Sequence, residues 1–357
     1  MIIINHVTKE SENVRKRVRE LGVIIGDLPT GEHNAITDVP SVLVGHVTLS
    51  EDLGNEDVIR TGVTAILPHQ QNPYHHKVPA ATHVMNGYGK ATGFVQIDEL
   101  GEIESPIMLT GTFTTGSVLQ GTMEYMMGCT PEIGDTTGSI NTVVGECNDS
   151  YLHTARTFAV KPTHAIQAIE RATSNCEEGS VGGGTGMTCY QYKGGIGTSS
   201  RIVQEKWTVG VLVNTNFGLR GEFESGHYKA PSKDHDTPAG SIMVVIATDA
   251  PVSDRQLKRI AKRASVGINR TGGRVHHASG DIIIAFSNAN ARTHFSEEEV
   301  VHSTYIKEDT KAFHYLLQAT IEATEEAILN SLTMAETTTG RNGRIIESIS
   351  YDVFESL

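Results

Sequence analysis

The run Gly240-Ser241-Ile242-Met243-Val244-Val245-Ile246-Ala247-Thr248 is the stretch on which the interpretation of this chain depends. It places a serine directly behind a glycine and at the head of a row of apolar residues. Because apolar residues fill consecutive positions of the row, it predicts a strand that is buried on both faces and covered by further layers. Taken alone, the serine has an ordinary explanation, since serines commonly open strands and glycines commonly end loops.

The segment in front of this strand has the opposite character. Residues 220–240 contain few apolar side chains, two prolines, several glycines and charges of both signs. Such a composition is typical of an exposed, mobile loop. The chain is therefore expected to pass from a polar loop into a buried strand between Gly240 and Ser241.

Further elements follow from the spacing of apolar residues. Four more runs are predicted to form strands, at residues 42–48, 62–67, 208–213 and 281–286. Helical spacing predicts a helix capped by Ser253 over 253–266, a second at 310–332 with a glutamate-rich outer face, and two weaker ones at 116–127 and 164–172. Strands interspersed with helices predict sheets that are covered by helices.

Composition excludes several classes of function. The 357 residues include 29 Lys plus Arg against 42 Asp plus Glu, a net charge of −13, which repels nucleic acids and anionic membranes. No apolar run approaches the roughly 20 residues of a membrane-spanning helix, and no export signal is visible. The four cysteines form no Cys-x-x-Cys pair, so we expect reduced thiols and a cytoplasmic protein.

Neither a metal nor a nucleotide is expected. The pairs His75-His76 and His276-His277 lack cysteine or carboxylate partners at ligand spacing, and no His-Glu-x-x-His is present. The glycines between residues 182 and 197 match neither phosphate-binding spacing. The sequence therefore predicts no cofactor.

Several ordered motifs together resemble one known family, the DmpA-type L-aminopeptidase/D-esterase-amidases and the related β-peptidyl aminopeptidases. The resemblance extends from about Leu21 to Ser287. The motifs that carry it are Asn34-Ala35-Ile36-Thr37-Asp38-Val39-Pro40, Val44-Gly45-His46, Arg60-Thr61-Gly62-Val63-Thr64-Ala65-Ile66-Leu67-Pro68, Val181-Gly182-Gly183-Gly184-Thr185-Gly186-Met187, Lys193-Gly194-Gly195-Ile196-Gly197-Thr198, Gly240-Ser241 and Ser279-Gly280-Asp281-Ile282.

The resemblance implies an α+β fold, a four-layer αββα sandwich similar to N-terminal-nucleophile hydrolases but with DmpA-type connectivity. It also implies a single catalytic domain over residues 1–357 that is made as an inactive precursor. Self-cleavage between Gly240 and Ser241 would leave an α chain of residues 1–240 and a β chain of residues 241–357.

The residue types at this bond suit self-cleavage. Gly240 has no Cβ beside its carbonyl, so the Ser241 hydroxyl can reach that carbonyl for an N-to-O acyl shift. The shift frees an α-amine whose reference pKa is about 7.7–8.0, close to working pH, and hydrolysis of the resulting ester completes the cut. Ser241 would then act as both nucleophile and base.

The resemblance assigns three further catalytic residues. Asn216 matches the asparagine whose side-chain amide stabilises the tetrahedral intermediate, with Asn214 as the alternative. Ser279 and Asp281, 38 and 40 residues after Ser241, match a Ser-x-acidic pair. They would hold the Ser241 amine by hydrogen bonds, and Asp281 would stabilise its charged form.

Substrate recognition is assigned in the same way. Glu146 matches the carboxylate that receives the free amino group of the substrate, as an aminopeptidase requires. Family members often carry threonine and an aromatic residue after this glutamate, where this chain has Cys147 and Asn148. Asn148, Tyr151 and Asn86 are candidate pocket residues, and Tyr151 could supply the missing ring.

The resemblance predicts a self-processing serine aminopeptidase that removes amino-terminal residues from short peptides, amino-acid amides or esters, including D- or β-residues, through an acyl-enzyme on Ser241. Two alternatives stay open, an acyltransferase of the ornithine-acetyltransferase type and an uncleaved, non-catalytic relative. Family members are typically oligomeric, so we expect a homo-oligomer of processed αβ pairs, such as a tetramer. Nucleic-acid and membrane partners are not expected.

Overall fold

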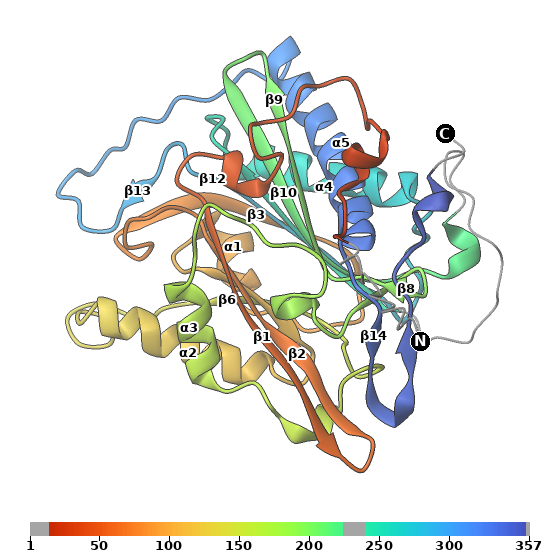
Figure 1. The fold of residues 1–357 in the computed structure, drawn as a ribbon. Helices are drawn as coiled ribbons and strands as arrows, with labels where there is room; N and C mark the ends of the chain where they lie inside the picture. Colours follow the sequence, from red (N-terminus) through yellow and green to blue (C-terminus); the bar gives the residue numbers. More distant parts are fainter. Residues whose placement is uncertain (1–13, 224–239, 355–357) are drawn as a thin grey trace, which may run out of the picture.

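Two β-sheets stacked face to face form the centre of the protein, as the computed structural model of residues 14–223 and 240–354 shows (Figure 1). The first sheet has the order β1 (Leu43–Gly54), β2 (Asp57–Leu67), β5 (Ile107–Gly111) and β6 (Val143–Cys147). The second has the order β13 (Arg292–Thr293), β3 (His76–Gly87), β12 (Gly280–Ser287), β11 (Ser241–Thr248), β10 (Trp207–Asn216) and β9 (Ile196–Val203), with β4 (Glu102–Ile103) beside β3.

Helices cover the outer face of each sheet. α2 (Thr115–Cys129) and α3 (Pro162–Glu170) pack on the first sheet, and α4 (Asp254–Arg270) and α5 (Lys311–Thr333) pack on the second (Figure 1). The shorter α1 (Phe94–Leu100) lies against β3. This order of layers confirms the predicted αββα sandwich.

Shorter elements complete the described chain. Two small hairpins pair β7 (Thr188–Cys189) with β8 (Tyr192–Lys193) and β14 (Thr338–Thr339) with β15 (Ile345–Ile346). The 3-10 turns are η1 (Val18–Leu21), η2 (Ile36–Asp38), η3 (Ala155–Thr157), η4 (Gly182–Gly184), η5 (Arg220–Glu222), η6 (Arg341–Gly343) and η7 (Tyr351–Val353). Within the part of the chain that the structure describes, no helix has the length and apolar character to cross a membrane.

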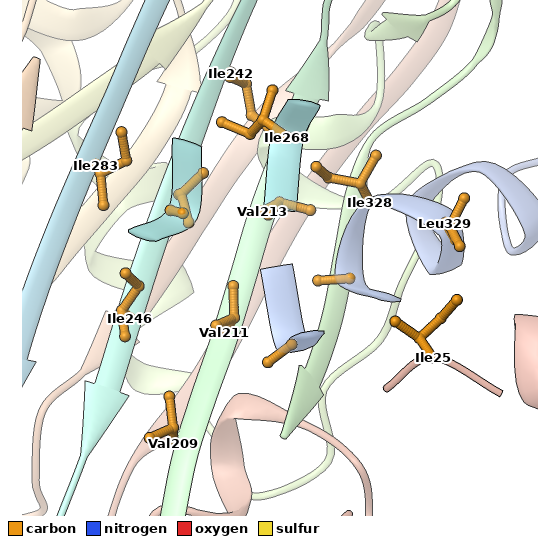
Figure 2. Packing of buried hydrophobic residues seen from close by; sticks show 14 of the residues in the cluster. Ile25, Val209, Val211, Val213, Ile242, Ile246, Ile268, Ile283, Ile328 and Leu329 are labelled. Atoms are coloured by element: carbon orange, nitrogen blue, oxygen red, sulfur yellow. The ribbon is translucent and has the colours of Figure 1, made fainter. Parts of the chain in front are cut away.

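Strand β11 is buried on both faces, as its sequence predicts. Ile242 and Ile246 belong to the core between the second sheet and helices α4 and α5, and Figure 2 shows both among side chains of these elements. Met243 and Val245 belong to the core between the two sheets. All eight residues of the strand are buried, so its first residue, Ser241, is held in place by the packing of the rest.

A β-α-β connection places the start of β11 beside the start of β12. The two strands are parallel and are joined by α4, because parallel neighbours need a crossover connection. Ser253 begins that helix by accepting a hydrogen bond from the Gln256 N–H, as its position in the sequence predicts. Since parallel strands start at the same end of a sheet, Ser241 lies opposite Gly280.

All the predicted strands and helices exist, and most of them are longer than predicted. The run at 208–213 is the middle of β10, which continues to Asn216. The run at 42–48 is the first part of β1, which continues to Gly54. The sequence patterns do not single out β3, β5, β6 or β9. Polar residues interrupt the apolar spacing of β3 and β9, and β5 and β6 are only five residues long.

The predicted glutamate-rich outer face of α5 is wrong. Glu322 and Glu326 are 2% and 0% exposed. Arg201 of β9, which is also buried, forms ion pairs with Glu322 at 3.1 Å and with Glu326 at 2.6 Å. Buried carboxylates need such partners, and the spacing of residues within α5 cannot reveal a partner on another element.

Most of the predicted loop at 220–240 lies outside the described residues. The described beginning of this segment differs from the prediction, because Glu222 and Phe223 are buried. Phe223 packs against Tyr190 with ring centroids 4.9 Å apart, and Glu222 Oε2 accepts a hydrogen bond from the Leu219 N–H at 2.9 Å. The aromatic contact and the satisfied carboxylate keep these residues in the fold despite the polar sequence around them.

Candidate active site

Ser241 stands at the head of β11, between two neighbouring strands. It pairs with Asn216 of β10 on one side and with Gly280 of β12 on the other. By strand alternation its side chain is on the same face as Met243, which points into the space between the sheets. The Ser241 hydroxyl oxygen accepts a hydrogen bond from the Asn148 N–H at 3.3 Å.

Gly240 has no room for a side chain. A Cβ at this position would lie 1.5 Å from the main-chain carbonyl oxygen of Asn216. The carbonyl oxygen of Gly240 accepts a hydrogen bond from the Gly280 N–H at 3.2 Å. The peptide that joins Gly240 to Ser241 is therefore held between β10 and β12, with its carbonyl group already facing a donor.

The side chain of Asn216 reaches the residue that contacts Ser241. Its Nδ2 donates a hydrogen bond to the Asn148 carbonyl oxygen, and its Oδ1 accepts one from the Thr188 N–H, both at 2.9 Å. The alternative, Asn214, is fully buried and donates instead to the Gly183 carbonyl oxygen at 3.2 Å. The geometry thus favours Asn216 over Asn214 as the side-chain amide of the site.

Ser279 and Asp281 lie next to each other at the start of β12. The Ser279 hydroxyl donates a hydrogen bond to Asp281 Oδ1 at 2.9 Å, while the buried Asp281 Oδ2 has no hydrogen-bond partner in the described chain. Burial raises the pKa of Asp281 to about 6, against the opposing effects of the Ser279 hydroxyl and of His276. Neither Ser279 nor Asp281 hydrogen-bonds to Ser241 within the described residues, although Asp281 is paired with Ile242, the next residue along β11.

Glu146 lies near the start of β12, beside the segment that follows β3. Its Oε1 accepts a hydrogen bond from the Lys90 N–H at 2.7 Å. A Cβ added to Gly89 would lie 3.1 Å from this oxygen and 3.6 Å from the Gly280 Cα. Since Gly280 pairs with Ser241, the structure brings the Glu146 carboxylate into the neighbourhood of the serine.

Of the three candidate pocket residues, only Asn148 contacts Ser241. Asn148 contacts Ser241 through its N–H and Asn216 through its carbonyl oxygen. Tyr151 lies under the Arg344 guanidinium, 4.7 Å from it, and no contact joins Tyr151 to Ser241 within the described residues. Asn86 lies opposite Asp281 on β3, where its amide donates to main-chain carbonyls of the turn before β12.

Three residues close to the site are given no role by the sequence. Thr188 donates its N–H to Asn216 Oδ1. Cys147 is buried and its thiol donates to the Asn214 carbonyl oxygen at 3.3 Å. Asp149 is also buried, and burial raises its pKa to about 7. The adjacency of Cys147 and Asp149 to the Glu146 motif is the signal that could have found them, whereas nothing in the sequence marks Thr188.

The arrangement suits acyl transfer to a hydroxyl group. It combines the Ser241 hydroxyl, amide donors from Asn148 and Asn216, and a carboxylate with a free oxygen at Asp281. No group of three or more His, Cys, Asp or Glu side chains is placed to hold a metal ion among residues 14–223 and 240–354. A hydroxyl at the head of a buried strand in an αββα sandwich is typical of hydrolases with the N-terminal-nucleophile fold.

Comparison with known proteins gives the family. The chain belongs to peptidase family S58, whose family model matches residues 34–346. Beta-peptidyl aminopeptidase BapA of Sphingosinicella microcystinivorans is 39% identical over 363 aligned residues, which cover 94% of this chain and 90% of that relative.

Solved structures agree with this assignment. A Burkholderia sp. beta-aminopeptidase has a TM-score of 0.87 and 36% identity, covering 96% of this chain and 98% of its own. The L-aminopeptidase D-Ala-esterase/amidase of Ochrobactrum anthropi, a variant of the N-terminal-nucleophile hydrolase fold, has a TM-score of 0.85 and 34% identity, covering 95% and 97%. The chain is therefore a hydrolase that acts on peptide bonds and has the DmpA-type fold.

Proposed function

We propose that this chain is a serine aminopeptidase that cuts itself between Gly240 and Ser241 and then uses Ser241 as its nucleophile. The observation that carries the proposal is the placement of this peptide. The Gly240 carbonyl oxygen accepts from the Gly280 N–H, and the Ser241 hydroxyl lies at the Asn148 N–H. The nucleophile and the carbonyl that it would attack thus belong to adjacent residues at the start of β11, where Ser241 pairs with both neighbouring strands.

Self-cleavage begins with attack of Ser241 Oγ on the Gly240 carbonyl carbon. The Gly280 N–H already donates to the carbonyl oxygen, so it stabilises the negative charge that develops there. The C–N bond then breaks, the nitrogen takes up the hydroxyl proton, and Gly240 is left as an ester on Ser241. The shift thus frees the α-amine of Ser241, and water then hydrolyses the ester, which frees the Ser241 hydroxyl and leaves Gly240 with a carboxylate.

Turnover of substrate uses the new α-amine as the base. With a reference pKa of about 7.7–8.0, the amine takes the proton from the hydroxyl and returns it to the leaving group. The free Oδ2 of Asp281 is available to an ammonium group, and its position one strand away supports a role in holding the amine. The second N–H of the Asn216 side-chain amide, which makes no hydrogen bond in the described chain, would donate to the tetrahedral intermediate.

The substrate requires a free amino group. Glu146 has one oxygen bound by the Lys90 N–H, and no hydrogen bond occupies its second oxygen within the described residues. A single carboxylate beside the nucleophile would select the amino end of a peptide. The names of the relatives, beta-peptidyl aminopeptidase and L-aminopeptidase D-Ala-esterase/amidase, support short peptides, amides or esters with L-, D- or β-residues at that end.

Association of several copies is part of the same proposal. The segment between β13 and α5 has no helix or strand from residue 294 to 306 and extends away from the body of the protein (Figure 1). Phe295, Val300 and Val301 expose more than half of their surface there. Apolar side chains gathered on an exposed segment are typical of an interface, and light scattering on the full chain would count the copies.

Hydrolysis of matched p-nitroanilides tests the proposed activity. We expect the wild-type protein to release p-nitroaniline from L-, D- or β-alanyl derivatives but not from their N-acetylated forms, since acetylation removes the charge that Glu146 would bind. Ser241→Ala should abolish release, and the control Ser174→Ala, at an exposed serine outside the site and the proposed interface, should retain it. Equal activity on free and acetylated substrates would contradict the aminopeptidase assignment.

A further inference from the structure

The amide of Asn86 is the centre of a small hydrogen-bond network beside the active site. Asn86 lies on β3, directly opposite Asp281 of β12. Its Nδ2 donates to the carbonyl oxygen of His276 at 3.1 Å, to that of His277 at 2.9 Å, and to that of Ser279. One side chain therefore holds three of the four residues of the turn at 276–279.

This turn leads directly into the reactive pair. The Ser279 N–H donates to the His276 carbonyl oxygen at 2.9 Å, and the Ser279 hydroxyl donates to Asp281 Oδ1 at 2.9 Å. The turn lies outside any helix or strand, so the sheet ladder does not fix its shape. On the side away from Asn86, His276 Nε2 contacts Glu222 Oε1 at 2.8 Å.

The backbone of β3 is irregular where Asn86 enters the network. Asp281 pairs with Asn86, whereas the next residue, Ile282, pairs with Val84, so Met85 forms a bulge. A bulge bends its strand and redirects the side chains next to it. The irregularity thus coincides with the residue whose amide meets three carbonyl groups.

We propose that Asn86 is a positioning residue for the reaction at Ser241, because it holds the turn that presents Ser279 to Asp281. The inference rests on the proposed function, which places Ser279 and Asp281 beside the Ser241 amine. An asparagine suits this position, since one planar nitrogen offers two N–H groups to convergent carbonyl oxygens, and aspartate, which has nearly the same size, offers none.

The proposed cleavage gives the network a second role. Asn86 and Glu222 precede the cut, and the turn at 276–279 follows it. After cleavage these contacts would join the α chain to the β chain. They would keep the pair of Ser279 and Asp281 in register with the new amino terminus, which has lost its covalent link to Gly240.

A double-mutant cycle tests the inference. We expect Asn86→Ala to lower kcat about tenfold, the effect of a lost positioning hydrogen bond, with KM changed less than about twofold. Rates are expressed per molecule of processed protein, counted by mass spectrometry. If Asn86 acts through Ser279, the double variant Asn86→Ala/Ser279→Ala should be no slower than Ser279→Ala alone.

A matched control separates positioning from general stability. Asn290 also donates its Nδ2 to a main-chain carbonyl oxygen, that of Thr304 at 2.9 Å, and it lies beyond the end of β12 that is opposite to the site. Asn290→Ala should leave kcat within about twofold of wild type. If Asn86→Ala does not fold, Asn86→Ser enters the same cycle, because its hydroxyl offers one donor in place of two and adds no charge.

The outcomes distinguish the two levels of the proposal. An active, processed wild type together with an unchanged Asn86→Ala would overturn the inference and leave the proposed function standing. The inference would also be overturned if the fold-loss of kcat in the double variant equalled the product of the fold-losses in Asn86→Ala and Ser279→Ala. The two effects would then be independent, so Asn86 would not act through Ser279. A wild-type chain that neither cuts itself nor turns over substrate would overturn the proposed function and the inference with it.

Discussion

Among individual residues, Gly240 is the one whose replacement probes the geometry of cleavage most narrowly. A methyl group at this position would lie 1.5 Å from the Asn216 carbonyl oxygen, so the peptide must shift away from β10. We expect Gly240→Ala to slow self-cleavage at least tenfold, measured as the fraction of intact chain over time on a denaturing gel. Gly116→Ala is the control, because a Cβ on Gly116 meets nothing within 4 Å. Cleavage of Gly240→Ala at the rate of that control would show that the observed peptide geometry does not matter.

Asp149 predicts a pH dependence of stability. Burial raises its pKa from 3.8 to about 7, so between these values the folded chain holds a proton that the unfolded chain has released. Stability must then fall as pH rises through this window. We expect the unfolding free energy of the uncleaved Ser241→Ala protein, measured in urea, to fall between pH 5 and pH 8. The fall should be about 2 kcal/mol larger than in the same protein that also carries Asp149→Asn. Equal losses in the two proteins would mean that Asp149 is ionised in the fold.

The sequence predicts which residues lie together at the candidate site better than it predicts the contacts between them. The motif matches single out Ser241, Asn216, Ser279 and Asp281, and the structure gathers them at the adjoining ends of β10, β11 and β12. Ser241 and Asn216 are connected through Asn148, which directly follows β6 of the other sheet. Contacts between elements depend on how the sheets stack, which local patterns in the sequence do not encode.

Among the secondary-structure elements, β11 and α5 show where sequence patterns succeed and where they fail. Consecutive apolar residues predict a strand buried on both faces, and β11 is such a strand. The acidic positions of α5 predict a solvated face, but Arg201 from β9 pairs with Glu322 and Glu326 inside the protein. Hydrophobic patterning therefore gives the type of an element, while a buried ion pair depends on residues far away in the chain.

The buried arginine provides a test of this packing. Arg201→Met would leave Glu322 and Glu326 as buried carboxylates with fewer partners, and losing one member of a buried ion pair typically costs about 3 kcal/mol or more. We expect Arg201→Met to lower the unfolding free energy by this amount when it is introduced into the uncleaved Ser241→Ala protein and measured in urea. Arg171→Met removes an exposed arginine instead and should change the unfolding free energy by less than about 0.5 kcal/mol. A similarly small change of the unfolding free energy in both variants would contradict a structural role for the ion pairs of Arg201 with Glu322 and Glu326.

For the molecule as a whole, the proposed cut would not separate the two fragments. Strands β11 and β12, which follow the cut, lie between β10 and β3, which precede it. The hydrogen bonds and apolar contacts of four adjacent strands would have to break before the fragments could part. We expect both fragments to elute together in gel filtration under native conditions and to separate only after denaturation. Elution of a free short fragment under native conditions would contradict the interleaved sheet.

The most direct test is the intact mass of the purified wild-type chain under denaturing conditions, beside that of Ser241→Ala. Cleavage at Gly240-Ser241 predicts two species in the wild type, of about 26 and about 12.6 kDa when 38.6 kDa is divided in proportion to 240 and 117 residues. The variant should stay whole at 38.6 kDa. A wild-type chain that remains whole after long incubation, or fragments that meet at any other bond, would contradict the proposal that Ser241 becomes an amino-terminal nucleophile.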